Sequence, residues 1–346
     1  MKLDFDDILL TPHPITNIDS RSVINTNLDN GYLPIFTAPM DTVISKVNQN
    51  NFNSNGIHTI IPRSKEVNHN PKSSDKNWLS YGLQQFIEVF IDNRQSKEDK
   101  HYILIDVANG HMPSVYSTTI KAKEIYGDSL VLMVGNIANP ESYTILSEAG
   151  ADFVRIGIGN GGGCLTTEQT GIGYPMASLI MDVYQESMLL DNPAKIVADG
   201  GFKKYADVIK GLALGADYIM LGSIFNKALE SCGTTTRLDE NGEHYSIDQY
   251  SQTTKDLFSS DTPLYKVFRG MSTKEVQLEW GNGNLKTSEG IVTINKVEYT
   301  LSGWVENFRH YLKSAMSYTD SKDLKGFIGM VEHNHVSEAS FKRYNK

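Results

Sequence analysis

The sequence predicts a (β/α)₈ barrel that occupies residues 1–346 as a single domain, and two observations carry this prediction. Short β-branched runs alternate with helix-length amphipathic segments along most of the chain, as in repeated βα units. Each predicted strand is also a continuous apolar run, which is typical of parallel strands covered on both faces. Glycine-rich ends follow many of these strands and not one switch point alone, so a doubly wound sheet is the weaker alternative.

Each predicted strand is an apolar run that stops at a polar or glycine-rich end. The first stops at Pro39, since a proline cannot donate to a sheet. The fourth stops before Asn109-Gly110, and the last four run into glycines. In order, the eight strands are expected at residues 35–38, 58–61, 79–82, 102–107, 130–134, 153–158, 195–198 and 218–221.

Amphipathic segments between and after these strands predict the helices. Examples between the strands lie at residues 112–126, 141–149 and 205–214, and a further helix is expected at 303–317. The stretch 233–295 differs, because it is rich in Gly, Asn, Thr, Ser and charge and shows little apolar periodicity. A stretch this long without clear elements is either disordered or a functional cover, and its composition suits a mobile flap over an active site.

Composition excludes several classes of protein. The chain has 346 residues, 40% of them hydrophobic, and can bury a sizeable core. A net charge of −9 argues against a nucleic-acid-binding surface or an anionic-membrane anchor, although a local basic pocket for a phosphate stays open. No apolar run approaches the length of a membrane span, and acidic residues interrupt the N-terminal apolar run, unlike a signal peptide.

The two cysteines, Cys164 and Cys232, lie far apart and form no CxxC or Cys/His cluster. A structural zinc site therefore has no support, and a reduced, cytoplasmic compartment is the simplest expectation. Cys164 closes the stretch FVRIGIGNGGGC, whose glycines stand at positions 157, 159, 161, 162 and 163. Such a loop brings main-chain groups close to a ligand at the edge where barrels hold their chemistry. The alternative is a surface loop beside an ordinary half-buried thiol.

The last two strands end in patterns suited to a nucleotide. Gly200-Gly201 and Gly222-Ser223 offer main-chain N–H groups to a phosphate, as is common after strands seven and eight of barrels. Asp199 is suited to accept hydrogen bonds from ribose hydroxyls, although it could instead only cap a tight turn. Together the strand ends predict a nucleoside monophosphate whose reactive part points towards Cys164.

Long motifs carry a resemblance over nearly the whole chain. KLDFDDILLTP, PIFTAPMDTV, GGGCLTT followed by TGIGYP, IVADGGF, GADYIMLGS and RGMS resemble landmarks of the IMP dehydrogenase/GMP reductase family. The resemblance implies a barrel whose loop cysteine attacks C2 of a purine nucleotide, with a nicotinamide cofactor exchanging hydride at that carbon. It also implies a homo-oligomer, most simply a tetramer.

Two chemistries share this frame, namely NAD-dependent oxidation of IMP and NADPH-dependent reductive deamination of GMP. Three features resemble the reductases: Asp106-Val-Ala-Asn109-Gly after strand four, the lack of an Arg-Tyr pair between Met271 and Gly303, and the segment Thr287-Ser-Glu289-Gly290. The absence of an inserted regulatory domain also fits. We therefore expect a GMP reductase-like enzyme, with an IMP dehydrogenase or a catalytically silent nucleotide-binding protein as alternatives.

The resemblance implies a role for each of three groups of residues. Catalysis falls to Cys164, Thr166 and Glu289. The nucleotide would be bound by Gly162, Asp199, Gly200, Gly201, Gly222, Ser223, Met271, Ser272, Lys286 and Gly290. NADPH would be bound by Asp106, Asn109, Gly135, Asn136 and Arg63, the last being equally interpretable as a solvated arginine. A monovalent cation, known in the family's dehydrogenases, would sit at Gly159, Gly161 and Cys164, but the residues themselves do not indicate one.

The chain departs from the family at three places. Relatives usually have Gly-Pro-Gly-Ser before the residue that precedes the cysteine, and this chain has Asn160-Gly161-Gly162-Gly163 in this loop. Gly162, two residues before Cys164, therefore lacks the serine hydroxyl expected at the phosphate. Lys286 stands where an arginine is more usual, which replaces a planar fork by a point charge. Leu165 replaces a threonine. These changes leave open a deoxynucleotide or a modified purine as substrate, as well as weak activity.

Overall fold

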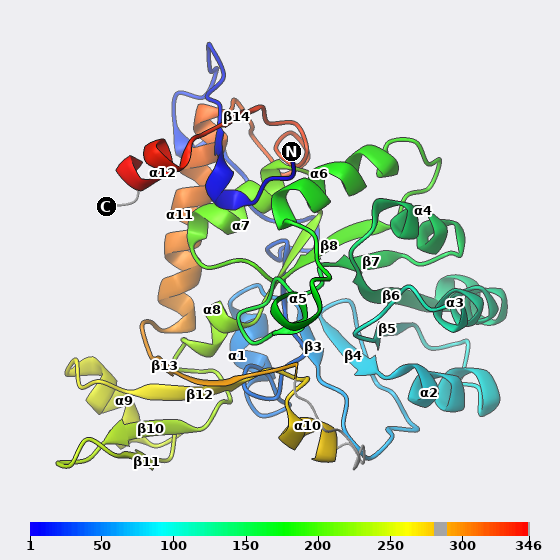
Figure 1. The fold of residues 1–346 in the computed structure, drawn as a ribbon, viewed down its shortest axis with the longest axis horizontal. Coiled ribbons are helices and arrows are strands. Elements are labelled where there is room, and N and C mark those ends of the chain that lie inside the picture. The colour runs from blue at the N-terminus through cyan, green and yellow to red at the C-terminus, as the bar shows by residue number, and fades with distance from the viewer. Residues whose placement is uncertain (280–288, 345–346) are drawn as a thin grey trace.

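The computed structural model describes residues 1–279 and 289–344, and within them eight parallel strands form one sheet (Figure 1). The strands follow the order β2-β9-β8-β7-β6-β5-β4-β3, and a parallel bridge from Phe36 to His58 joins β2 to the start of β3. This closes the ring and confirms the predicted (β/α)₈ barrel. The strands are β2 (Ile35–Thr37), β3 (Thr59–Ile61), β4 (Asn77–Tyr81), β5 (His101–Asp106), β6 (Leu130–Ile137), β7 (Phe153–Ile156), β8 (Lys195–Asp199) and β9 (Tyr218–Leu221).

Helices surround this ring, except that the short α5 (Thr166–Thr170) lies in front of the strands at the centre of the view (Figure 1). They are α1 (Gln49–Ser54), α2 (Leu83–Phe86) with a π-helical turn (Ile87–Asp92), α3 (Pro113–Tyr126), α4 (Pro140–Glu148), α5, α6 (Met176–Ser187), α7 (Tyr205–Ala213), α8 (Ser223–Asn226) and α11 (Leu301–Tyr318). Local signals set their starts: Pro113 and Pro140 stand in the first turns of α3 and α4, and the Asn139 side chain accepts from the Glu141 N–H at 2.8 Å. The four predicted helices begin and end within two residues of their expected bounds.

Strand ends differ from the prediction where the backbone changes direction. Strand β7 stops at Ile156 and not at residue 158, because Gly157 has a φ of +127° that an extended strand does not adopt. Strand β6 continues to Ile137, beyond the expected residue 134. The strand expected at 79–82 begins earlier, at Asn77.

Large apolar side chains fill the inside of the barrel, so it is a core and not a channel. The rings of Phe36 and Trp78 pack edge-on with their centroids 5.6 Å apart, and those of Trp78 and Phe153 pack edge-on at 5.0 Å. The buried members of this cluster are Phe36, Ala38, Ile60, Trp78, Leu104, Met133, Val197 and Met220. Because the interior is full, ligands can bind only at its ends.

The described parts of the stretch 233–295, residues 233–279 and 289–295, contain strands and helices, so the expectation that the stretch lacks clear elements was wrong. These strands form an antiparallel sheet in the order β11-β10-β12-β13. The sequence shows no alternation of apolar and polar residues here, because the covered face of the sheet carries polar residues. Lys266 is fully buried, and its ammonium donates to the Ser231 carbonyl at 2.7 Å and to Gln249 Oε1 at 3.0 Å. Burial lowers the pKa of Lys266 to about 8. The elements are β10 (Thr235–Leu238), β11 (His244–Ser246), α9 (Gln252–Ser259), β12 (Tyr265–Arg269), α10 (Lys274–Glu279) and β13 (Val292–Lys296).

The two ends of the chain pack against one flank of the barrel. β1 (Ile8–Leu10) pairs antiparallel with β14 (His333–His335), and α12 (Glu338–Tyr344) follows. The Lys210 ammonium of α7 donates to the Phe5 carbonyl at 2.7 Å, and the ring of Phe5 lies 5.1 Å from that of Phe202. The N-terminal segment thus supports the turn that follows β8.

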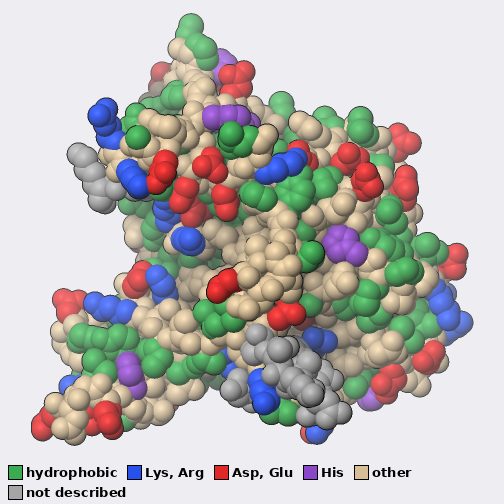
Figure 2. Space-filling view, in the orientation of Figure 1, with side chains coloured by type: hydrophobic (Ala, Val, Ile, Leu, Met, Phe, Trp, Pro, Cys, Tyr) green, Lys and Arg blue, Asp and Glu red, His purple; other side chains and the backbone are tan. Residues whose placement is uncertain are grey.

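Charge is spread over the surface without a basic patch on the visible face. In Figure 2 the described Lys and Arg side chains on that face stand among acidic ones and do not gather. No helix in the described ranges is long and apolar enough to cross a membrane.

The buried His58 predicts a stability change with pH. Its ring lies among Tyr32, Phe36 and Tyr218, and burial lowers the pKa of His58 from 6.5 to about 4. Between these values the unfolded chain takes up a proton that the folded state refuses, so the free energy of unfolding falls as the pH falls through that window. From pH 7 to pH 5 this loss is about 2 kcal/mol.

Urea unfolding of the natural protein and of a His58→Phe variant at both pH values measures this contribution. We expect the variant to lose about 2 kcal/mol less than the natural protein over the same interval. An identical pH dependence in both proteins would contradict the assignment to His58.

Candidate active site

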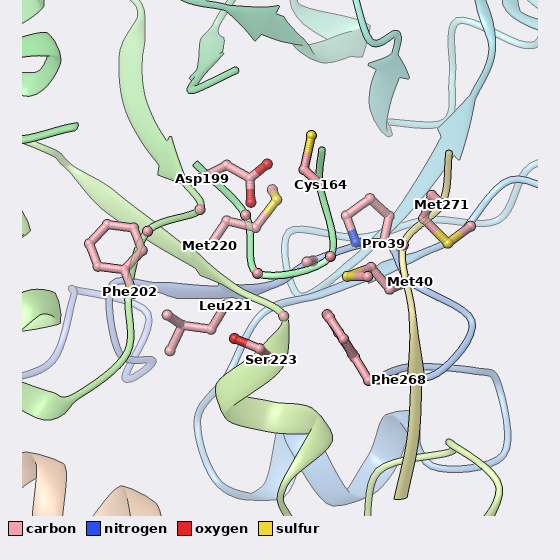
Figure 3. Close-up of a pocket in the computed structure, with 18 of the residues that line it drawn as sticks. Pro39, Met40, Cys164, Asp199, Phe202, Met220, Leu221, Ser223, Phe268 and Met271 are labelled. Atoms are coloured by element: carbon pink, nitrogen blue, oxygen red, sulfur yellow. The ribbon is translucent and has the colours of Figure 1, made fainter. Parts of the chain in front are cut away.

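A pocket opens at the carboxyl ends of the barrel strands (Figure 3), and its empty space, part of which is open to solvent, is about 780 Å³. Cys164 and Asp199 lie towards one end of it in this view, and Ser223 lies towards the other. The described residues that line it include Met40, Gly161, Gly162, Gly163, Cys164, Asp199, Gly200, Gly201, Phe202, Met220, Gly222, Ser223, Phe268, Met271 and Ser272. Cys164 thus lies at the mouth of the barrel, at the strand end where the sequence analysis expects it.

Three side chains form a hydrogen-bonded chain at this mouth. The Cys164 thiol donates to Thr166 Oγ1 at 3.2 Å, and the Thr166 hydroxyl donates to Glu289 Oε2 at 2.5 Å. Thr166 lies two residues after the cysteine, whereas Glu289 lies far along the chain, in the segment that leads into β13. A nucleophile hydrogen-bonded through a hydroxyl to a carboxylate can pass its proton outward along this chain.

Main-chain pairing holds Glu289 against the cysteine loop. The Leu165 N–H donates to the Glu289 carbonyl at 2.7 Å, and the Ile291 N–H donates to the Gly163 carbonyl at 3.2 Å. Cys164 and Gly290 thereby form an antiparallel bridge. The cysteine loop acts as an added strand beside the segment that leads into β13, which fixes the distance between nucleophile and carboxylate.

Glycine is required at two close approaches around the loop. Gly200 has a φ of +90°, and a Cβ on it would lie 2.8 Å from the Gly161 nitrogen. A Cβ on Gly270 would lie 2.2 Å from the Gly163 carbonyl oxygen. The turn after β8 and the segment after β12 therefore pack against opposite parts of the loop, which larger residues would push away.

The far end of the pocket presents donors and no basic side chain. Within the described residues, no protein acceptor engages the N–H groups of Gly201, Gly222 or Ser223. The Ser223 hydroxyl lies beside Gly162, where an added Cβ would stand 3.8 Å from Ser223 Oγ and touch nothing closer. This end suits an anion held by N–H and hydroxyl groups, with room left at Gly162.

A second pocket, whose empty space including the part open to solvent is about 930 Å³, meets the first at Cys164. Its lining includes Arg63, Asp106, Val107, Asn136, Gly157, Gly159, Asn160, Cys164, Thr166, Met271 and Ser272. A group bound here would face the same sulfur as a group in the first pocket. The arrangement brings two ligands together at one reactive atom.

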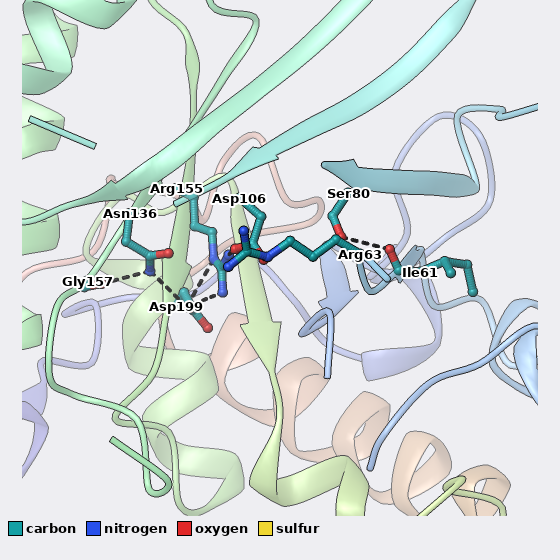
Figure 4. Close-up of polar contacts among 8 residues, drawn as sticks. All are labelled: Ile61, Arg63, Ser80, Asp106, Asn136, Arg155, Gly157 and Asp199. Atoms are coloured by element: carbon teal, nitrogen blue, oxygen red, sulfur yellow. Dashed lines mark hydrogen bonds and ion pairs between the residues drawn. The ribbon is translucent and has the colours of Figure 1, made fainter. Parts of the chain in front are cut away.

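Arg155 joins the two pockets, and sequence reasoning missed it. It is 8% exposed, and its guanidinium lies between Asp106 and Asp199 (Figure 4). Burial alone would lower the pKa of Arg155, but the charges of Asp199 and Asp106 together raise it. The signal was present: a lone charge inside the apolar strand Phe153–Ile156 must find partners when buried.

A second ion pair that sequence reasoning missed ties the added sheet to the barrel. Arg269, at the end of β12, pairs with Asp41 through Nη2 and Oδ2 at 2.5 Å and through Nε and Oδ1 at 3.2 Å. Arg269 directly precedes the segment that carries Met271 and Ser272 into both pockets. The pair therefore anchors that segment against the loop after β2.

Most of the residues expected at the site lie there, with four differences. Gly290, expected at the nucleotide, is buried in the bridge to Cys164 and lines neither pocket. Asn109 is exposed and outside both pockets; its side chain accepts from the His111 N–H at 3.1 Å and shapes a turn. Gly135 lies in β6, packed against Arg155 and not in either lining. Lys286 lies outside the described residues. Within residues 1–279 and 289–344, no group of three or more His, Cys, Asp and Glu side chains could hold a metal ion.

Comparisons with known proteins agree with this geometry. Residues 93–345 match the model of a family described as the IMP dehydrogenase / GMP reductase domain. Proteins named GMP reductase from Staphylococcus aureus strains MRSA252, JH9 and Newman are each 30% identical to this chain over 336 residues. Each alignment covers 93% of this chain and 93% of the relative.

Proposed function

The chain belongs to the IMP dehydrogenase/GMP reductase family, and from this premise we propose that it converts GMP to IMP and ammonia with NADPH as reductant. Members of the family are oxidoreductases that act on purine nucleotides with a nicotinamide cofactor. We also propose that the protein is a cytoplasmic homotetramer that uses NADPH and not NADH. Each subunit would be one catalytic domain over residues 1–346, with residues 233–295 covering the active site.

The observation that carries the proposal is the hydrogen-bonded chain from Cys164 through Thr166 to Glu289. Deamination at C2 needs a nucleophile and an acid in the same site, because an amino group leaves readily only after protonation. One chain of hydrogen bonds can provide both: it accepts the thiol proton and later returns it. A nucleotide-binding protein without catalysis has no use for this arrangement.

The first half of the proposed reaction uses only this chain and GMP. The thiol proton passes through Thr166 to Glu289 as Cys164 Sγ bonds to C2 of the guanine. Glu289 then returns the proton through Thr166 to the 2-amino group, the C2–N bond breaks, and ammonia leaves with the bonding electrons. The purine is left joined to Cys164 through a C2–S bond.

The second pocket fits the nicotinamide cofactor that the family uses, because it opens on the same sulfur and is lined by polar groups of Asp106, Asn136 and Arg63. A reduced nicotinamide bound there would supply the hydride that C2 accepts. The C2–S bond then breaks and Cys164 leaves as a thiolate, which takes a proton from solvent. Met271 and Ser272 line both pockets and would hold the purine between the sulfur and the cofactor.

Recognition of the nucleotide divides along the first pocket. Asp199 Oδ1 accepts from no described residue and would receive a ribose hydroxyl. The N–H groups of Gly201, Gly222 and Ser223, which no described residue accepts from, would hold the phosphate. Because Asp199 and these phosphate donors lie at different places along the pocket, the nucleotide would bind in one orientation, with its base at Cys164.

Absorbance of the reduced cofactor separates the candidate reactions. Mixing the protein with GMP and NADPH should remove the signal and release ammonia, and replacing NADPH by NADH should slow the loss. Mixing it with IMP and NAD should produce no comparable signal. A signal gained only in the second mixture would establish the IMP dehydrogenase alternative, and binding without turnover in either mixture would establish the silent one.

Gly162 gives a prediction of improved binding. A serine there meets no steric obstacle and would place a second hydroxyl beside Ser223 at the phosphate end. A hydrogen bond to a charged group contributes about 1.5 kcal/mol or more, so Gly162→Ser should lower the KM for GMP by about tenfold. Steady-state kinetics measure this change.

Gly161→Ser is the matched control, because its side chain would point towards the Cys164 Cβ and not towards Ser223. We expect Gly161→Ser not to lower the KM for GMP. A KM for GMP that rises in Gly162→Ser would show that the phosphate does not lie at this end of the pocket.

A further inference from the structure

Three charged side chains belong to both pockets: Asp106, Arg155 and Asp199. The turn glycines Gly200 and Gly201 lie only in the lining of the first pocket, and Asn136 and Arg63 lie only in that of the second. A line of polar contacts therefore leads from one binding region to the other, and Arg155 is at its centre (Figure 4).

The Arg155 guanidinium decides which oxygen of Asp199 faces the nucleotide. Its Nε and Nη2 donate to Oδ2 at 3.0 and 2.9 Å, and the Asn136 amide donates to the same oxygen at 3.0 Å. These donors occupy Oδ2 and leave Oδ1 for the ligand. Figure 4 shows the second oxygen of Asp199 directed away from these donors.

The same guanidinium orients Asp106 on its other side. Arg155 Nη1 donates to Asp106 Oδ1 at 2.7 Å, while Asp106 Oδ2 lies 3.7 Å from Arg63 Nε. The side chains of Arg155, Asp106 and Asp199 are 10%, 15% and 17% exposed, so water screens these charges only weakly. Because the guanidinium is a rigid plane, fixing one carboxylate restricts the other.

We propose that Arg155 is a positioning residue that makes the binding of nucleotide and cofactor mutually favourable. A ribose hydroxyl on Asp199 Oδ1 would restrain further a carboxylate that Arg155 and Asn136 already hold, and the rigid Arg155 guanidinium would extend that restraint to Asp106. The cofactor would then lose less conformational entropy when it contacts Asp106, because the first ligand has already restricted the shared side chains. By linkage the cofactor must tighten the nucleotide by the same factor. This inference rests on the proposed function.

Calorimetric titration of GMP into a Cys164→Ala protein, which binds without turnover, measures the coupling. With Arg155 in place, saturating NADPH should tighten GMP by about tenfold, within the usual range of such couplings. Arg155→Met should reduce this factor to about twofold or less, and Arg155→Lys should give an intermediate value because an ammonium lacks the fork that spans both carboxylates.

Lys123→Met is the matched control. Lys123 is a half-buried cation of α3 that pairs with Asp152 at 3.0 Å and lies outside both pockets, so its removal should leave the tenfold factor unchanged. If Arg155→Met does not fold, Arg155→Lys with an unchanged melting temperature decides the question. A purely structural role for Arg155 would weaken GMP equally with and without NADPH.

Three results would overturn the inference, and they differ in what they say of the reaction. One contrary result is that the Arg155 variants keep the tenfold factor, and another is that the parent protein shows no such factor. If the natural chain still turns over GMP and NADPH, either result overturns this inference alone. No binding of GMP to the parent protein overturns the proposed function and the inference with it.

Discussion

Replacing Cys164 with alanine is expected to lower kcat on the order of 10⁵-fold, because the proposed reaction passes through a bond to its sulfur. Neither Thr166 nor Glu289 can substitute for it, since both are placed to move a proton and not to attack carbon. The affinity for GMP should change by less than about threefold, because Asp199 and the phosphate donors are untouched. Stopped-flow absorbance and calorimetry measure the two quantities.

Cys232→Ala is the control for the loss of a thiol. Cys232 lies outside both pockets, its thiol donates to the Asp41 carbonyl at 3.1 Å, and burial raises the pKa of this thiol to about 11. It is therefore an inert thiol, and its variant should keep most of the turnover. Equal losses in the two variants would point to general damage and not to a nucleophile.

Replacing Glu289 with glutamine is expected to lower kcat by about 10²- to 10³-fold with little change in GMP binding. Glutamine keeps the shape and can still accept from the Thr166 hydroxyl, but it cannot take up the thiol proton or return it to the amine. The effect should therefore fall on turnover and not on KM. Steady-state kinetics of GMP with saturating NADPH separate the two.

Variants of Thr166 test whether the proton moves along the chain. Thr166→Val breaks the chain and should cost about as much as Glu289→Gln, while Thr166→Ser keeps the hydroxyl and should retain most activity. Combining Thr166→Val with Glu289→Gln should add little, because residues that act as a unit are not additive. A multiplicative loss would mean that the two side chains act separately.

The barrel could be predicted from the sequence because its signal is local. The run before Pro39 and the run before Gly222 each read as a buried parallel strand without knowledge of their neighbours. The glycine loop ending at Cys164 was visible for the same reason, since several glycines in a row have few other uses. For the eight barrel strands, local signals failed only at the strand bounds, as at Gly157.

The added sheet could not be predicted because its covered face is polar. Lys266 is fully buried on β12, so the sequence lacks the alternation of apolar and polar residues that predicts a strand. Arg155 was missed for a related reason: its partners, Asp106 and Asp199, belong to other strands and meet it only when the barrel closes. The pairing of Asp41 with Arg269 also depends on contact between distant parts of the chain.

Asn109 shows the limit of carrying a role over from resemblance. The strand-end motif matches the family, yet its side chain turns to the His111 N–H and lies outside both pockets. Neighbouring Asp106 does line both pockets. A motif thus identified the right strand end, and the fold decided which of its side chains face the ligand.

The bond between Cys164 and the purine is the claim on which the account depends, and mass spectrometry of the acid-quenched protein tests it directly. After mixing with GMP, the peptide that contains Cys164 should gain the mass of one GMP less one ammonia, and later addition of NADPH should remove that mass. Turnover of GMP with no added mass on Cys164, or with the mass on another residue, would contradict the account.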